Sequence, residues 1–130
     1  MSTAQIKAGT AGTVLMVEDE TTLRVAVACM LRRRGFSVIE AEDGLAGVDL
    51  YLAHQTEVEL VLLDVNLPGM SGLDVLKTLV GIRPDVKVIL TSACSKDILA
   101  STTGDGRPLA FLRKPYHVDE LLRVMHDAGL

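Results

Sequence analysis

The sequence contains few aromatic residues. It has no tryptophan, two tyrosines and two phenylalanines, so that aromatics make up 3% of its 130 residues. Because 48% of the residues are hydrophobic, a chain of this length can still bury a sizeable core, and that core must be aliphatic. Length and composition therefore predict one globular domain.

Cysteine is also scarce. The two cysteines, Cys29 and Cys94, are too few for a disulfide framework. Cys29 lies in an apolar helical pattern, and we expect it to pack there as a small hydrophobic residue. Free thiols are typical of a reducing compartment, so we expect a cytoplasmic protein.

The sequence shows no targeting segment, no membrane span and no basic character. Residues 1–12 are small and polar and lack the apolar core of a signal peptide, so we expect a flexible tail or linker. No apolar run approaches the roughly 18 residues of a membrane-spanning helix. A net charge of −4 disfavours binding to nucleic acid or to anionic membranes. We therefore expect no direct partner of either kind.

Five short apolar runs alternate with segments of helical periodicity. The runs predict buried strands at residues 13–17, 37–41, 60–63, 86–90 and 109–112. Helical spacing predicts helices at 20–34, at 44–53, after an N-cap at Ser71, at 95–106 and at 117–127. The fourth of these should be short or frayed, because it ends in the sequence TTGDG. This order predicts an α/β domain over residues 13–128, with a parallel sheet covered by helices on both faces.

Apolar residues at helical spacing predict the buried face of each helix. In chain order, these residues are Leu23, Val27, Met30 and Leu31, then Leu45, Val48 and Leu52, then Leu73, Leu76 and Val80, and finally Val118, Leu121, Leu122 and Met125. Gly35 stands where the first helix should end.

Polar side chains follow four of the five predicted strands. In chain order they are Glu18 and Asp19, then Asp64, then Thr91 and Ser92, and finally Lys114. The carboxyl ends of parallel strands meet at one edge of the sheet, where α/β proteins bind their ligands. We therefore expect these side chains to lie close together.

This set of side chains suits phosphoryl transfer. Clustered carboxylates need a cation, and Mg²⁺ prefers oxygen ligands and also binds phosphate oxygens. Asp64 could attack phosphorus to form an acyl phosphate, with Glu18 and Asp19 as metal ligands. Lys114 and Ser92 could then stabilise the transferred group. Each residue alone has an ordinary explanation as a turn residue, a helix cap or a solvated charge, so the prediction depends on their coming together.

The motifs LMVEDE, LLDVNLPGMSG, ILTSA and FLRKP resemble those of the receiver domain of bacterial two-component response regulators, and the resemblance covers residues 13–127. It implies a doubly wound, flavodoxin-like fold with strand order 2-1-3-4-5. It implies that Asp64 accepts a phosphoryl group from a sensor histidine kinase or a histidine phosphotransfer protein. Mg²⁺ would be held by Asp19, Asp64 and the backbone carbonyl of Asn66, with Glu18 contributing directly or through water. Lys114 would contact the phosphoryl group.

The resemblance also implies a switch hydroxyl, for which Thr91 and Ser92 compete. The family pattern places a small residue directly after the hydroxyl and the lysine 22 positions later. Ser92 fits, since Ala93 follows it and Lys114 lies 22 positions on. Neighbouring strand residues point to opposite faces, so only one of the two can face the phosphoryl group. We choose Ser92.

Three further positions have roles in the family pattern. Phe111 replaces the usual switch aromatic and lacks a tyrosine's hydroxyl. Asn66 and Cys94 stand two residues beyond the acceptor and the hydroxyl, where side chains tune the lifetime of the phosphoryl group. For Cys94 we favour a packed or merely exposed thiol over a redox role. Glu18 departs from the usual aspartate, which leaves its contribution to the metal site open.

We expect a signalling domain that catalyses only its own phosphorylation and dephosphorylation. A phosphatase with an aspartyl nucleophile would carry a second acid two residues after the first, where this chain has Asn66. A binding module independent of phosphorylation is the other alternative. We expect either a stand-alone regulator or the receiver of a larger protein such as a hybrid histidine kinase. The family also implies a homodimer through the last helices.

Overall fold

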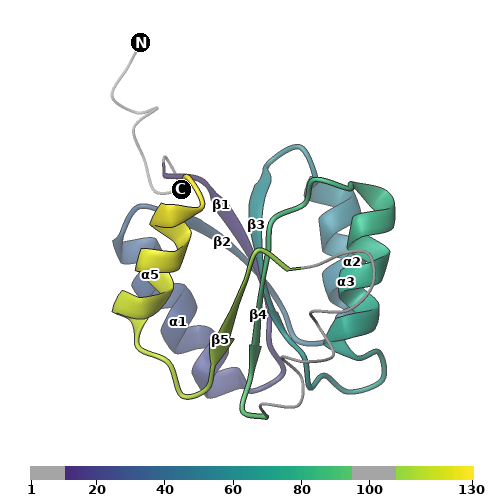
Figure 1. Cartoon of the computed structure of the whole chain (residues 1–130), viewed down its shortest axis with the longest axis horizontal. Helices are drawn as coiled ribbons and strands as arrows, with labels where there is room; N and C mark the ends of the chain where they lie inside the picture. The colour runs from purple at the N-terminus through teal and green to yellow at the C-terminus, as the bar shows by residue number, and fades with distance from the viewer. Residues whose placement is uncertain (1–10, 95–107) are drawn as a thin grey trace.

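A five-stranded parallel sheet forms the centre of the computed structural model, which describes residues 11–94 and 108–130 (Figure 1). The strands lie in the order β2-β1-β3-β4-β5. They comprise β1 (Thr13–Val17), β2 (Ser37–Ala41), β3 (Val58–Asp64), β4 (Val88–Ser92) and β5 (Ala110–Arg113). This confirms the predicted α/β fold and its strand order.

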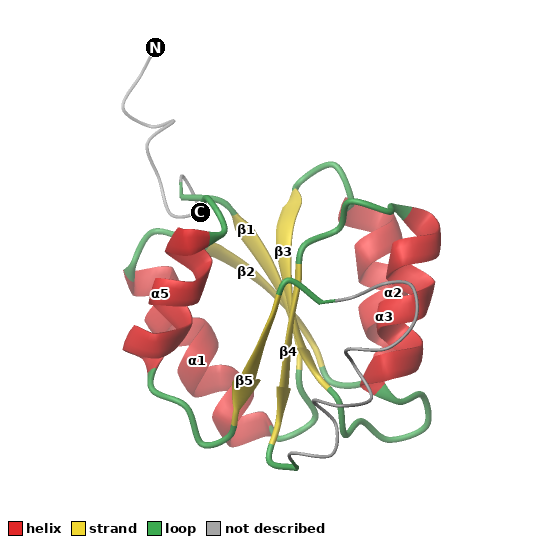
Figure 2. Ribbon diagram, in the orientation of Figure 1, coloured by secondary structure: helices red, strands yellow, loops and turns green. Residues whose placement is uncertain are grey.

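Helices cover both faces of the sheet (Figure 2). On one face lie α1 (Thr21–Arg33) and α5 (Val118–Asp127), and on the other lie α2 (Gly44–His54) and α3 (Gly72–Ile82). The fourth predicted helix, at residues 95–106, lies outside the described residues. Among the helices that the structure describes, none is long and apolar enough to cross a bilayer.

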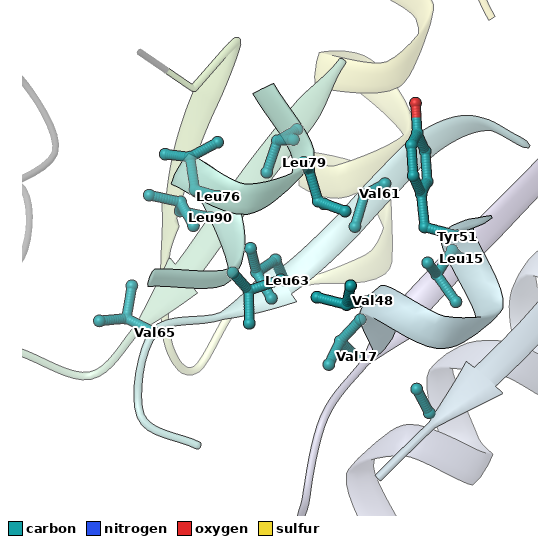
Figure 3. Packing of buried hydrophobic residues seen from close by; sticks show 13 residues of the cluster. Leu15, Val17, Val48, Tyr51, Val61, Leu63, Val65, Leu76, Leu79 and Leu90 are labelled. Carbon is teal, nitrogen blue, oxygen red and sulfur yellow. The ribbon is translucent and has the colours of Figure 1, made fainter. Parts of the chain in front are cut away.

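The core divides into two clusters, one on each face of the sheet. Alternate residues of β1 point to opposite faces, so Leu15 and Val17 join one cluster and Val14 and Met16 join the other. The cluster that contains Leu15 packs against α2 and α3 (Figure 3). Both clusters are almost entirely aliphatic, as the composition predicts.

The predicted helix boundaries at Ser71 and Gly35 are confirmed. Ser71 caps α3, because its hydroxyl accepts a hydrogen bond of 3.2 Å from the backbone N–H of Asp74. Gly35 follows α1 with a φ of +94°, a conformation that favours glycine. The N–H groups of Gly35 and Phe36 then donate to the carbonyls of Arg32 and Leu31 and close the helix.

The predicted buried face of α2 is wrong at two positions. Leu45 and Leu52 are 67% and 50% exposed, whereas Gly47 and Tyr51 face the sheet. A Cβ atom at Gly47 would lie 2.9 Å from a methyl group of Val17. Because glycine allows this close approach, the helix packs through the face that contains Gly47 and Tyr51, and Leu45 and Leu52 turn outward.

The predicted packing of Cys29 and Met30 on α1 is also wrong. Cys29 is exposed and Met30 is 41% exposed. The buried residues of this helix are Val27, Ala28 and Leu31. A turn takes 3.6 residues, so burying these three directs the two residues between them towards solvent.

The strands β3, β4 and β5 extend further towards their carboxyl ends than their apolar runs predict, whereas β1 and β2 have the predicted bounds. β4 begins at Val88 instead of residue 86 and includes Thr91 and Ser92, and β3 includes Asp64. Backbone pairing explains the difference, because the N–H of Val65 still donates to the carbonyl of Thr91 at 2.9 Å. The predicted polar residues at these two strand ends are therefore held by the sheet itself.

Candidate functional site

Three carboxylates meet at the carboxyl edge of the sheet, beyond β1 and at the end of β3. Oxygen atoms of Glu18, Asp19 and Asp64 lie within 4.8 Å of one another. Glu18 and Asp64 are buried, whereas Asp19 is exposed. The buried apolar strands β1 and β3 pair side by side, and this pairing brings acids 45 residues apart in the sequence into one cluster.

Lys114, which follows β5, reaches into this cluster. Its Nζ lies 2.6 Å from Glu18 Oε1 and 3.1 Å from Asp64 Oδ2. Burial alone would lower the pKa of the Lys114 ammonium, but the hydrogen bonds and charges of the two carboxylates raise it above its ordinary value. Lys114 therefore stays protonated and joins the ends of β1, β3 and β5. The peptide bond between Lys114 and Pro115 is cis.

Backbone N–H groups hold the remaining oxygen of each buried acid. Glu18 Oε2 accepts a hydrogen bond from the N–H of Glu20 at 3.1 Å. Asp64 Oδ1 accepts one from the N–H of Asn66 at 3.0 Å. Both buried carboxylates are thus fixed in orientation before any ligand binds, which is the arrangement that favours catalysis by preorganised charge.

Ser92 lies beside this cluster at the end of β4 and is fully buried. Its Oγ accepts hydrogen bonds from Asn66 Nδ2 at 3.3 Å and from the N–H of Cys94 at 3.0 Å. Ser92 therefore faces the loop that follows Asp64. Thr91 is buried and pairs with Asp64 through the sheet register.

The other predicted residues lie around the cluster. Phe111 on β5 is partly buried and packs against the core cluster of α2 and α3. Asn66 and Cys94 are both exposed.

Tyr116 was not predicted as a site residue, but it lies close to the cluster. Burial and then the charges of Glu18 and Asp64 raise the pKa of its phenol. No spacing rule connects that tyrosine with acids about 50 to 100 residues earlier in the chain.

Glycine is required where α3 begins. A Cβ atom at Gly72 would collide with the carbonyl oxygen of Asp64. The N–H of Gly72 donates to the carbonyl of Val65 at 2.8 Å and closes the loop onto the strand end. Gly72, which the sequence marks only as part of a loop, therefore lets that loop pack directly against Asp64.

The donor atoms fit a divalent magnesium ion. Three carboxylates and one ammonium leave two uncompensated negative charges in a small, partly buried space. All the acidic donors are hard oxygen atoms, and Mg²⁺ binds with a few such ligands while keeping several waters. The exposed carboxylate of Asp19 offers such an oxygen directly to solvent.

Comparison with known proteins agrees with this geometry. Residues 14–126 match the family model of the response regulator receiver domain. The chain is 34% identical over 113 residues to the cell cycle transcriptional regulator CtrA of Caulobacter vibrioides, which covers 87% of this chain and 48% of CtrA. The chain thus spans about half the length of that relative.

Two solved structures share the fold. A receiver domain protein from Clostridium thermocellum superposes with a TM-score of 0.82 at 26% identity, covering 90% of this chain and 93% of that one. The response regulator TrrA of Thermotoga maritima, in complex with Mg²⁺ and BeF, gives a TM-score of 0.77 at 28% identity, covering 89% and 97%.

Members of this family are signalling modules, not enzymes in the usual sense, and bind Mg²⁺ at their acidic pocket. They interact with histidine kinases and phosphotransfer proteins. The chain belongs to the response regulator receiver domain family and is a receiver module of two-component signalling.

Proposed function

We propose that Asp64 accepts a phosphoryl group from a phosphohistidine, with Mg²⁺ bound beside it. The convergence of Glu18, Asp19, Asp64 and Lys114 at one edge of the sheet carries this proposal. The domain that acts in this way spans residues 13–128. The donor is a sensor histidine kinase or a histidine phosphotransfer protein, and the domain works in the cytoplasm, where its two cysteines stay reduced.

Asp64 is the nucleophile. A carboxylate oxygen of Asp64 donates an electron pair to phosphorus while the bond from phosphorus to the donor imidazole breaks, and the imidazole keeps that bond's electrons. Asp19, Asp64 and the backbone carbonyl of Asn66 would hold the metal, with Glu18 acting directly or through water. When bound, the ion neutralises charge on the phosphoryl oxygens.

Lys114 exchanges partners during this step. In the resting state its ammonium bonds to Glu18 and Asp64. As the phosphoryl group arrives, the ammonium moves from the Asp64 oxygen to a phosphoryl oxygen and keeps its bond to Glu18. Because both bonds are to buried anions, the positive charge is already in place, and little reorganisation is needed.

A hollow beside Lys114 gives room for the donor. It has a volume of about 370 Å³ and is lined by Leu23, Ala93, Pro115 and Tyr116, with Glu20 and Lys114 as its charged members. An imidazole is flat and largely apolar on its faces, so an apolar hollow next to the phosphoryl-binding ammonium suits it.

Phosphorylation would shift an existing equilibrium of the domain. The phosphoryl group carries roughly −1.5 to −2 charges and replaces the single negative charge of the Asp64 carboxylate. The Ser92 hydroxyl, now bonded to Asn66 and Cys94, would turn towards the new oxygens. Phe111 would fill the space that this movement leaves, while Asn66 and Cys94 tune the lifetime of the phosphoryl group. The changed surface includes β5 and α5, through which a homodimer would form.

Labelling with a small phosphodonor tests the proposal. We expect Mg²⁺-dependent incorporation of one phosphoryl group into the wild-type chain and none into Asp64→Asn. Asp49→Asn is the control, because Asp49 is exposed on α2. Equal labelling of Asp64→Asn and wild type would refute the assignment. Continuous release of phosphate from a phosphate ester would instead support a phosphatase, and no labelling at all would support a binding module.

A further inference from the structure

Arg24, in the first turns of α1, is bonded to the backbone of the acidic cluster. Its Nη1 donates to the carbonyl oxygen of Glu18 at 2.9 Å. Its Nε lies 3.3 Å from Glu40 Oε1 on β2. The Arg24 side chain is only 13% exposed, so both interactions are partly shielded from water. The roles assigned so far do not involve Arg24 or Glu40.

Hydrogen bonds fix the peptide units on both sides of Glu18. The N–H of Glu18 donates to the carbonyl of Ala41 at 3.0 Å, and its carbonyl accepts from Arg24. Because a peptide unit is planar, the direction of the Glu18 carbonyl sets the direction in which the chain continues to Asp19. Asp19 is exposed, so the position of its carboxylate depends on this backbone.

Glu40 orients the arginine. It binds two arginines of α1, with Arg24 at one oxygen and Arg32 at the other, the latter at 3.1 Å. Arg32 also donates to a backbone carbonyl, that of Val38, at 2.9 Å. Both arginines thus pair with Glu40 and donate to a backbone carbonyl. For Arg24 that carbonyl belongs to Glu18, whereas for Arg32 it belongs to Val38.

We propose that Arg24 is a positioning residue for the metal site: through the Glu18 carbonyl it holds Asp19 where the ion binds. This inference rests on the proposed function. The direction of the change in Mg²⁺ affinity distinguishes this role from simple electrostatics, because removal of a nearby positive charge should by itself strengthen the binding of a cation. Loss of positioning should weaken that binding, since the groups behind metal ligands typically contribute 10- to 100-fold to metal affinity.

The test is the Mg²⁺ dissociation constant of four proteins, measured by calorimetry: wild type, Arg24→Lys, Arg24→Gln and Arg32→Gln. Arg24→Lys keeps the charge but loses the planar fork. We expect binding about tenfold weaker in both Arg24 variants and unchanged within about twofold in Arg32→Gln. Circular dichroism confirms folding, and Arg24→Met, which keeps the aliphatic stem but removes the guanidinium, replaces any variant that does not fold.

A second readout separates positioning from a general structural defect. At saturating Mg²⁺, phosphorylation of Arg24→Lys should reach the wild-type rate, with only the half-saturating Mg²⁺ concentration raised. Mg²⁺ binding by the Arg24 variants that is as tight as wild type, or tighter, would overturn the inference and leave the proposed function intact. Failure of the wild type to bind Mg²⁺ would instead refute the metal site, and the role of Arg24 with it.

Discussion

The two edges of the sheet carry ion pairs of different kinds. At the carboxyl edge, Lys114 bonds to two acids whose side chains are only 3% and 4% exposed. At the opposite edge, Arg83 pairs with Asp85 at 3.2 Å, but the two side chains are 46% and 80% exposed. Water already solvates the exposed pair, so it contributes little to stability. In the buried group, Lys114 is the cation that Glu18 and Asp64 contact among the described residues, so the group is sensitive to any missing member.

Lys114→Met should produce the largest effect. It leaves Glu18 and Asp64 buried without their cation, and breaking such a group typically costs about 3–5 kcal/mol of the free energy of unfolding. We expect a loss of about 3 kcal/mol in urea denaturation without metal, together with loss of most phosphoryl transfer. Mg²⁺ should restore part of that stability because it replaces the missing charge. An equal loss with and without Mg²⁺ would contradict this account of the cluster.

The two ends of α3 offer a second comparison. Gly72→Ala places a methyl group against the Asp64 carbonyl, so we expect about 2–3 kcal/mol of destabilisation and slower phosphorylation. A Cβ at Gly81 meets no atom within 4 Å, so Gly81→Ala should stabilise the helix by about 0.5 kcal/mol. Chemical denaturation of both variants measures the difference. Similar stabilities of the two variants would show that the loop around Gly72 can move to accommodate a methyl group.

The two tyrosines report the charge at each edge. Burial raises the pKa of both phenols. Arg83 lowers the pKa of Tyr51 by more than Asp85 raises it, whereas Glu18 and Asp64 raise the pKa of Tyr116 further. Because the chain has no tryptophan, ultraviolet titration can follow both phenols. Tyr116 should ionise at higher pH than Tyr51, and Tyr51→Phe identifies which transition belongs to which residue. Ionisation of Tyr116 before Tyr51 would contradict the described charge distribution.

The same shifts predict how stability depends on pH. A group whose pKa is raised by folding stabilises the protein below its unfolded pKa, and the contribution is lost as pH rises through the folded value. Lys114, Tyr51 and Tyr116 are all raised, so the free energy of unfolding should fall above about pH 10. Tyr116→Phe should flatten that fall. If the free energy of unfolding of Tyr116→Phe falls with rising pH as steeply as that of the wild type, Tyr116 is not the source of the fall.

Removal of the exposed pair should have the smallest effect. Asp85→Ala leaves the half-exposed Arg83 side chain with water and its hydrogen bond to the Gln55 carbonyl, so we expect a change below about 1 kcal/mol in the free energy of unfolding. Phosphorylation should be unaffected. A loss comparable to that of Lys114→Met would remove the distinction between the two edges.

The apolar runs predicted the parallel sheet and the meeting of the acids with Lys114, because strand ends depend on local apolar patterns. The strand order followed from the resemblance to receiver domains. Val27, Leu31 and Val48 are buried as predicted, but the predictions for Met30 on α1 and for Leu45 and Leu52 on α2 were wrong. That outcome depends on glycine contacts such as Gly47 against Val17, which no periodicity records. The interaction of Arg24 with Glu40 was missed for a related reason, since it requires α1 and β2 to lie side by side.

The most direct test of the central claim is to locate the phosphoryl group. Wild-type protein is incubated with a small phosphodonor and Mg²⁺, digested, and mapped by mass spectrometry. The account predicts one acyl phosphate, on Asp64, which disappears when Mg²⁺ is removed. A phosphoryl group on any other residue, or on Asp64 at the same level without Mg²⁺, would contradict it.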